Sequence, residues 1–431
     1  MSEQLLAGTC EVDITPAAGT PLCGSLAPRP SLGIEDPLYA KAIVLRAGDR
    51  TLAYVILDIA VLERAQGDEA VRLASERTGI APDHIVWACS HTHTGPYTAF
   101  DEEMGGGVVD HKWLNELPQR FAQCVAGAQD AMVPARASRA RGYHGGLAQT
   151  RRYRFKDGRQ VNNWLLTGAE ADLQCVGAAS PIDPEVGILA FEDQSGRMLA
   201  VLFSFTLHAN ANFGDRFSGD YPAVVASRMR GRFGPQVSTL YLPGACGDQN
   251  SSGPRHRQVG DALAEVIFAG LSRRSPLADP VRIGALKREI VVPCHDVYMD
   301  QEDRIRDSQW SALEQEFFRR SQAILRREGR RQANAILQAW HIGEVGFASL
   351  PGEPFVHWGF KLKQESPFPW TYMVELGGDY LGYLITPDAW QGGGYESLVS
   401  CVSKIAPAGV ETMVNCCVNM LHELDTARRR C

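Results

Sequence analysis

Short apolar runs alternate with amphipathic stretches over the first 130 residues. The runs are rich in Val, Ile, Leu and Ala and are separated by turns, which is typical of strands. The amphipathic stretches repeat their apolar positions at helical spacing and end near glycine. This alternation predicts an α/β protein in which helices flank a mixed β-sheet. The predicted elements are strands at residues 40–45 and 52–59, a helix at 64–77, a strand at 85–88 and a helix at 113–131.

The same pattern continues, with one polar interruption, to about residue 350. Residues 143–182 are polar and Gly-rich, and we expect a loop there. Residues 301–340 are the most charged stretch, and their apolar positions have helical spacing, so a charged helical insertion is expected at about 300–340. No Pro/Ser-rich linker divides the chain, and we expect one large body over residues 1–431. Further strands are predicted at 186–191, 199–206, 237–242 and 344–349, and further helices at 223–232 and 258–272.

Composition limits the possible partners of the 431-residue chain. Its net charge of −7 argues against nucleic acid, which needs a basic field. No apolar run approaches the roughly 18 residues of a membrane span, and no signal peptide is expected at the N-terminus. The eleven cysteines are scattered without a CxxC pair, which is typical of reduced thiols. We therefore expect a cytoplasmic protein with a small-molecule substrate and no stable membrane association, and a homo-oligomer stays an open alternative.

Four polar clusters follow predicted strands, which is where active sites of open α/β sheets are built. His91 and His93 are two residues apart and can face one site, and imidazole is a common zinc ligand. His208 lies just after the predicted strand at 199–206, and Glu353 follows a Pro-Gly pair. The His91 and His93 pair favours a metal site, His208 alone is more typical of a hydrogen-bonded histidine, and Glu353 alone fits a capped turn equally well. The clusters are residues 90–96, His208 with the turn at 218–221, the loop at 244–250, and residues 350–354 with 379–387 and 394–396.

Taken in order, these motifs resemble the neutral/alkaline non-lysosomal ceramidase family. The resemblance extends over about residues 8 to 400 and covers the zinc-amidase domain, without the C-terminal β-sandwich domain of the family. It rests on the ordered set of short motifs, because each motif alone has only modest specificity for the family. The motifs are Val12-Asp13-Ile14-Thr15-Pro16, residues 36–42, Asp58, Ser90-His91-Thr92-His93-Thr94-Gly95-Pro96, residues 183–187, Ser218-Gly219-Asp220-Tyr221, Gly244-Ala245-Cys246-Gly247-Asp248 and Leu350-Pro351-Gly352-Glu353.

The resemblance implies a zinc amidase that cleaves N-acyl bonds. Its metal ligands would be His91, His208, Glu353 and Tyr383. His93 would face the substrate and move protons, since the pKa of histidine is normally near 6.5. Arg151 and Tyr395 match residues that reach the family site. Asp220 and Asp248 are candidates for orienting the ligands.

Two departures from the family pattern concern the nucleophile and the substrate. Asn250 stands where ceramidases carry a serine, and Ser251 lies one position further along. An amide hydrogen-bonds but cannot act as a nucleophile, so Asn250 is expected to orient a substrate carbonyl. Thr150 replaces the asparagine that precedes the site arginine. These departures favour a small soluble substrate over ceramide.

The expected reaction is hydrolysis of an amide bond by water that Zn²⁺ activates. An esterase, a lactonase or an enzyme that forms an amide or ring needs the same metal and the same oxyanion stabilisation, so the sequence leaves these open. A non-catalytic ligand-binding protein is the alternative from another class. The presence of all four inferred ligands favours catalysis.

Overall fold

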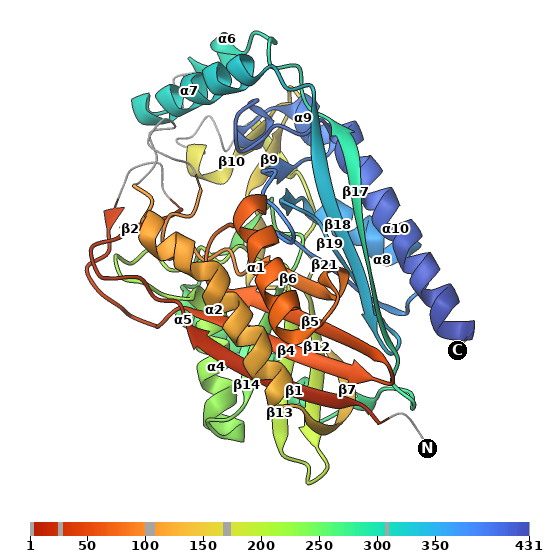
Figure 1. Ribbon diagram of the computed structural model, residues 1–431. Coiled ribbons are helices and arrows are strands. Elements are labelled where there is room, and N and C mark those ends of the chain that lie inside the picture. The colour runs from red at the N-terminus through yellow and green to blue at the C-terminus, as the bar shows by residue number, and fades with distance from the viewer. Residues whose placement is uncertain (1–3, 25–28, 100–107, 167–173, 307–309, 431) are drawn as a thin grey trace.

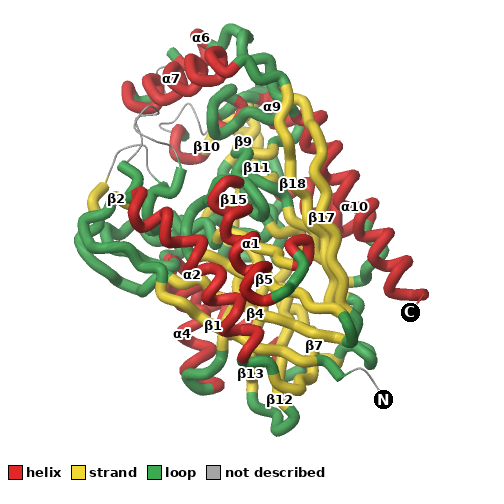
Figure 2. The backbone as a smooth tube through the Cα atoms, viewed as in Figure 1, coloured by secondary structure: helices red, strands yellow, loops and turns green. Residues whose placement is uncertain are grey.

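The computed structural model describes residues 4–24, 29–99, 108–166, 174–306 and 310–430. Two β-sheets pack face to face, and helices cover their outer faces (Figures 1 and 2). The fold is therefore mixed α/β with several sheets flanked by helices, as the sequence predicts. The larger sheet has nine strands. In spatial order they are β14 (Ser238–Pro243), β13 (Met198–Phe205), β12 (Glu185–Asp193), β7 (Val133–Tyr143), β1 (Leu6–Asp13), β4 (Tyr39–Ala47), β5 (Arg50–Leu57) and β6 (Ile85–Cys89), with β16 (Ser275–Pro276) beside β7.

The second sheet is four-stranded and packs through aromatic side chains on the first. Tyr54 of the large sheet stacks on Trp340 with ring centroids 6.0 Å apart, and Trp340 stacks on Phe347 at 5.2 Å. These rings belong to a buried core that both sheets share. The strands of the second sheet, in order, are β17 (Ile283–Pro293), β18 (Gln332–Ile342), β19 (Val345–Ser349) and β21 (Trp370–Val374).

Strict alternation along the central strands explains why both faces of the large sheet are covered. In β5, Leu52, Tyr54 and Ile56 enter the core between the sheets, while the residues between them enter the core under the helices. A strand whose two faces are both buried reads as a continuous apolar run. Helices α1 (Arg64–Thr78), α2 (His111–Asp130), α4 (Asp220–Phe233) and α5 (His256–Leu271) cover the large sheet, and α8 (Val356–Glu365) and α10 (Pro407–Arg430) cover the small one.

The charged insertion ends earlier than expected. Helices α6 (Glu302–Ile305) and α7 (Ala312–Glu328) form within it, at one end of the molecule (Figure 1). Residues 332–342, however, form strand β18, so the prediction of helix up to residue 340 is wrong there. Eight consecutive residues of β18 are buried, and such a run lacks the periodicity that separates a buried strand from a buried helix.

The predicted loop at 143–182 contains short strands instead of loop alone. Their pairing partners include β15 (Gln249–Ser251), about 100 residues along the chain, so no local pattern could reveal them. The short strands are β8 (Ala148–Thr150), β9 (Arg152–Phe155), β10 (Gln160–Asn162) and β11 (Cys175–Ala178).

The helices within the described residues are too short or too polar to cross a membrane. The ten described cysteines are all free.

A buried ion pair fixes the end of β5, where the first histidine loop docks. Lys41 Nζ lies 3.0 Å from Asp58 Oδ2, and both side chains are almost fully buried. Burial raises the pKa of Asp58, and Lys41 opposes this rise. The carbonyls of Leu57 and Ile59, on either side of Asp58, accept the backbone N–H groups of Ser90 and His91.

Replacement of Lys41 by methionine should lower the free energy of unfolding by about 3–5 kcal/mol, because Asp58 would keep a buried charge without a partner. Chemical denaturation checks this. The matched control is Arg72→Gln, which breaks exposed pairs with Glu69 and Glu76 and should cost less than about 1 kcal/mol. Equal losses in the two variants would contradict the role assigned to the buried pair.

Candidate metal and active site

The ends of separate strands bring the predicted ligands together. His91 follows β6, and His208 follows β13. Glu353 lies on the two-residue strand β20 (Glu353–Pro354), which follows β19. Strand β20 pairs in parallel with β22 (Tyr383–Leu384), and this pairing places Glu353 beside Tyr383. Loops at strand ends can converge while the sheets hold them rigid.

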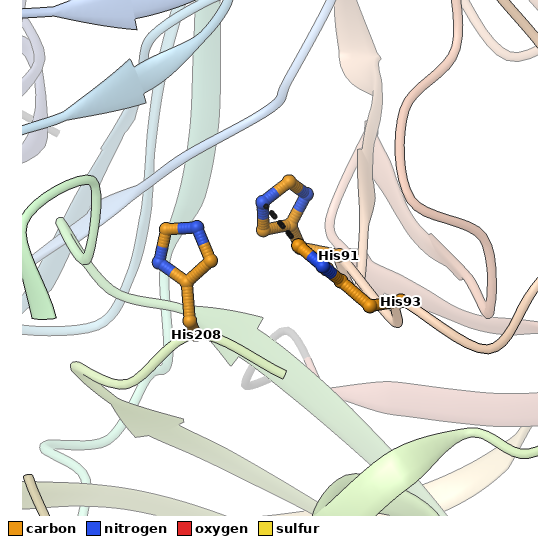
Figure 3. Close-up of side chains that lie close together, drawn as sticks. All are labelled: His91, His93 and His208. Atoms are coloured by element: carbon orange, nitrogen blue, oxygen red, sulfur yellow. Dashed lines mark hydrogen bonds between the residues drawn. The ribbon is translucent and has the colours of Figure 1, made fainter. Parts of the chain in front are cut away.

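Three imidazole rings converge at the centre of the site (Figure 3). One ring nitrogen from each of His91, His93 and His208 falls within 4.8 Å of the others. The Nε2 atoms of His91 and His93 are 3.4 Å apart. His91 also has a left-handed backbone, with φ at 63°, which is strained for a residue with a side chain. Such strain is concentrated at functional sites, and it persists here because the loop around His91 is anchored on both sides.

Hydrogen bonds at the far side of two rings aim their lone pairs inward. His91 Nδ1 lies 3.0 Å from the carbonyl of Ala60, and His208 Nδ1 lies 2.7 Å from that of Cys246. A nitrogen that faces a carbonyl carries the hydrogen, so in the neutral ring, which is the form that binds a metal, the lone pair lies on Nε2. Both Nε2 atoms face Glu353 Oε2, at 3.3 Å and 3.2 Å. This buried oxygen has no hydrogen-bond partner in the structure.

Converging lone pairs and a carboxylate require a positive charge between them. Burial alone would lower the pKa of His91, but the negative charge of Glu353 raises it to about 9. Burial lowers the pKa of His208 to about 4, and burial and the two other imidazoles hold that of His93 well below its usual range. At neutral pH and without a metal, the cluster would therefore hold one additional proton, on His91, which makes that ring a cation. A divalent cation can replace that proton, and the nitrogen and carboxylate donors suit Zn²⁺ as well as iron, manganese or cobalt.

A buried arginine borders the histidine cluster and directs a free donor into the site. Arg151 Nη1 lies 3.5 Å from His208 Nε2, and Arg151 Nε donates to Glu396 Oε1 at 2.7 Å. Arg151 Nη2 is buried and has no hydrogen-bond partner. The guanidinium also lies 5.0 Å from the ring of Tyr383. An oriented and unsatisfied N–H group in a dry site is suited to bind a substrate oxygen.

A mostly apolar cavity of about 140 Å³ opens on this cluster. Tyr395 forms part of its wall, and the ring of Tyr395 lies 5.8 Å from that of Tyr383 in an edge-on arrangement. Phe317, from α7 of the charged insertion, closes another side. The remaining lining residues are Cys23, Gly24, Ala60, Val61, His91, His93, Tyr97, Glu353, Tyr380, Tyr383 and Val402.

The glycine-rich loop at 244–248 supports the ligands from behind. A Cβ on Gly247 would lie 2.3 Å from the carbonyl oxygen of Glu353, so only glycine permits this close approach. Cys246 donates from both its N–H and its thiol to the buried carboxyl of Glu375, at 3.1 Å and 2.9 Å. Since the Cys246 carbonyl accepts from His208, these contacts orient that histidine. Burial raises the pKa of the Cys246 thiol well above its usual value, which does not favour a nucleophile.

Three of the residues expected in catalysis lie outside the cavity lining, namely Arg151, Asp248 and Asn250. Asp248 accepts from the N–H of Val356 at 2.9 Å and from the hydroxyl of Ser180 at 2.6 Å, so it joins loops. Asn250 accepts from the amide of Asn210 at 3.3 Å and lies on β15. His93, expected to face the substrate, also lies close enough to the other imidazoles to act as a metal donor.

Three further residues hold the site in place; Tyr380 and Glu396 lie in the predicted clusters but carry no predicted role, and Glu375 lies outside them. Tyr380 donates to Glu353 Oε1 at 2.9 Å. Glu396 is fully buried between Arg151 and Arg152 and accepts hydrogen bonds from both. Glu375 orients Cys246. The adjacent arginines at 151 and 152 were the available signal, because two buried guanidinium groups need a carboxylate.

Comparison with known proteins finds ceramidases that are similar to this chain in sequence and in fold. The chain is 24% identical over 189 residues to neutral ceramidase of Pseudomonas aeruginosa, and the match spans 42% of this chain and 26% of that protein. The crystal structure of neutral ceramidase from Pseudomonas aeruginosa aligns with all of this chain and 75% of its own, with a TM-score of 0.75 and 16% identity. A structure of ceramidase complexed with C2 aligns with a TM-score of 0.74, 16% identity and coverage of 99% and 76%. No family model matches the chain. The resemblance that the motifs indicate is confirmed in sequence and in fold.

The purified chain should retain about one transition-metal ion, and His91→Ala and Glu353→Ala should abolish this retention because each removes a converging donor. Elemental analysis after dialysis measures the metal. His111→Ala is the matched control, because His111 is an exposed residue at the start of α2 and should leave the metal content unchanged. Full occupancy in the His91 and Glu353 variants would contradict the ligand assignment.

His93→Ala separates the two roles that the geometry offers to His93. If His93 only moves protons, this variant keeps the metal. If His93 is a ligand, metal retention falls as it does in His91→Ala. The same elemental analysis distinguishes these outcomes without any substrate.

Proposed function

We propose that this chain is a metal-dependent hydrolase that cleaves the amide (N-acyl) bond of a small soluble substrate, with water as the nucleophile. One observation carries the proposal. The inward lone pairs of His91 and His208 and the unpartnered oxygen of Glu353 meet beside the free N–H of Arg151, at the wall of an apolar cavity. This combination suits the activation of water next to a carbonyl group.

Metal binding and carbonyl binding fall to different residues. His91, His208 and Glu353 would hold the metal, with Tyr383 adjacent. When bound there, Zn²⁺ would supply Lewis acidity for the activation of water. Arg151 Nη2 would donate to the substrate carbonyl oxygen, and the hydroxyl of Tyr395 would donate from the cavity wall. Because Glu396 holds the Arg151 guanidinium in place, this donor is already oriented before the substrate binds.

His93 is the proposed proton carrier. Its low pKa keeps the ring neutral at pH 7, so it can accept a proton from the attacking water and return it to the leaving nitrogen. No serine, threonine or cysteine nucleophile is needed for this route, which agrees with the presence of asparagine at residue 250. Asn250 and Asp248 would then support the loops and not the reaction.

The amide bond and the size of the substrate rest on separate grounds. The two named relatives are ceramidases, and the matched segment covers about a quarter of the curated one, so the bond type is carried over as part of the proposal. The cavity of about 140 Å³ is smaller than the usual range for drug-sized ligands, which favours a short acyl group. We propose that the reaction takes place in the cytoplasm.

The direct test is a hydrolysis screen with the zinc-loaded chain. Short N-acyl amides should be cleaved, and matched esters and lactones with the same acyl group identify the preferred bond. His91→Ala is the inactive control. Failure to cleave any of the three classes, in a protein that holds its metal, would contradict the proposal and favour a ligand-binding protein.

Tyr395→Phe should lower kcat by about 100-fold with a small change in KM, because one donor to the developing oxyanion is lost while the ring is kept. The ring packs against Trp164 and Phe318, so phenylalanine should preserve the wall. Steady-state kinetics on the substrate found in the screen measures the effect. Tyr143→Phe, at an exposed residue, is the control, and an equal kcat in both variants would remove Tyr395 from the mechanism.

A further inference from the structure

A second cavity, of about 300 Å³, lies behind the wall of the reaction cavity. The turn η4 (Tyr395–Ser397) separates the two. Tyr395 lines the reaction cavity, whereas Gly394 and Leu398, on either side of the turn, line the second one. The two cavities therefore share this turn as part of their walls, and the proposed reaction leaves the second cavity without a role.

Among the residues that the structure describes, the lining of the second cavity carries positive charge and no carboxylate. Its charged members are Arg304, at the end of α6, and Arg159, beside β10. Arg159 is mostly exposed and pairs with Asp157, while Arg304 is partly buried. Among the described residues, Arg304 forms no ion pair, and its Nη2 donates a hydrogen bond to Ser397 Oγ at 2.9 Å. A guanidinium has five N–H donors, so most of those of Arg304 remain for a ligand.

The surroundings of Arg304 leave its charge uncompensated. The positive charge of Arg152 acts on Arg304, and the carboxylate that pairs with Arg152, Glu396, belongs to the turn η4 itself. Burial and the repulsion of Arg152 lower the pKa of Arg304 from its usual value. A half-buried cation without a partner is costly, and an anionic ligand would remove that cost.

Gly393 gives Arg304 access to this position. A Cβ on Gly393 would lie 3.0 Å from Arg304 Nη2, and the backbone there has φ at 89°. The lining also includes the apolar side chains of Trp310, Leu165 and Leu398. The cavity therefore offers a guanidinium to a planar anion and apolar contacts to the body that carries it.

We propose that this cavity binds a small organic anion, a carboxylate or phosphate on an apolar body, with Arg304 as its main charged contact. The anion is either a free small molecule or the charged end of the substrate. The site itself does not depend on the proposed hydrolysis, because it rests on residues outside the metal cluster. The Arg304 fork would bind two oxygens of the anion side by side.

Benzoate and its neutral isostere benzamide are the probes, titrated calorimetrically into the zinc-loaded full chain. Benzoate should bind saturably at millimolar concentrations, and benzamide should bind at least about tenfold more weakly because the charge is missing. Arg304→Gln keeps a donor for Ser397 and should weaken benzoate binding by about tenfold or more. Arg306→Gln is the matched control, since Arg306 is exposed, is paired with Asp303 and should leave the affinity unchanged.

Two further variants keep the test decisive. If Arg304→Gln does not fold, Arg304→Lys keeps the charge but loses the fork, and should bind benzoate with intermediate affinity. His91→Ala should retain benzoate binding, which separates this site from a carboxylate bound at the metal. Absence of saturable benzoate binding in the unsubstituted chain, equal affinity in Arg304→Gln, or loss of binding only in His91→Ala would each overturn the proposal.

Kinetics identifies the source of the anion and rests on the proposed hydrolysis. If the anion is the charged end of the substrate, Arg304→Gln raises KM for anionic N-acyl compounds and leaves KM for neutral ones unchanged. If the anion is a separate molecule, both KM values stay the same while benzoate binding is lost. Both results uphold the site, and an inactive chain that still binds benzoate would count against the hydrolase alone.

Discussion

The buried negative charge of Glu353 is the constraint on which the arrangement of the site depends. A carboxylate out of contact with water needs a nearby positive charge, and two imidazole nitrogens lie 3.2–3.3 Å from its Oε2. The second oxygen, Oε1, is held by the hydroxyl of Tyr380. Around this centre the protein fixes each partner from behind, through the Ala60 and Cys246 carbonyls and the close approach of Gly247. The site is thus organised by the need to compensate one charge, and a metal cation meets that need with the donors already in place.

The two-sheet scaffold makes such compensation possible because rigid, well-packed strands hold the segments that carry the polar side chains. Alternating side chains fill the cores on both faces of the large sheet, so its strands have little freedom to move. His91 and His208 follow strands, in loops, and the Lys41–Asp58 pair with its neighbouring backbone hydrogen bonds ties the His91 loop to the end of β5. The loops can therefore carry strained residues such as His91, whose cost is met by the packing beneath them.

Local patterns predicted the elements that lead into the site, and with them His91, His208 and Glu353, because an apolar run that stops at a polar cluster is visible in a few residues. The remaining features depend on segments far apart in the chain. Tyr380, Glu375 and Glu396 matter only for what lies beside them, and β8 and β15 exist only as a pair. The same limit explains the error at β18, whose buried run carries no period that distinguishes strand from helix. The placement of Asp248 and Asn250 behind the wall is a matter of loop geometry, which spacing does not encode.

The sharing of Glu396 has an evolutionary consequence. Arg151 and Arg152 are neighbours in sequence, yet one reaches the histidine cluster and the other supports Gly393 at the second cavity. One carboxylate serves both, so substitution at residue 396 would strand two buried cations at once, while substitution at either arginine alone would leave the other still paired. The three positions therefore form an epistatic unit in which the order of replacement decides whether a lineage stays folded. We therefore expect changes that reshape the two cavities to fall on residues outside this unit, such as Phe317 on one side and Trp310 on the other.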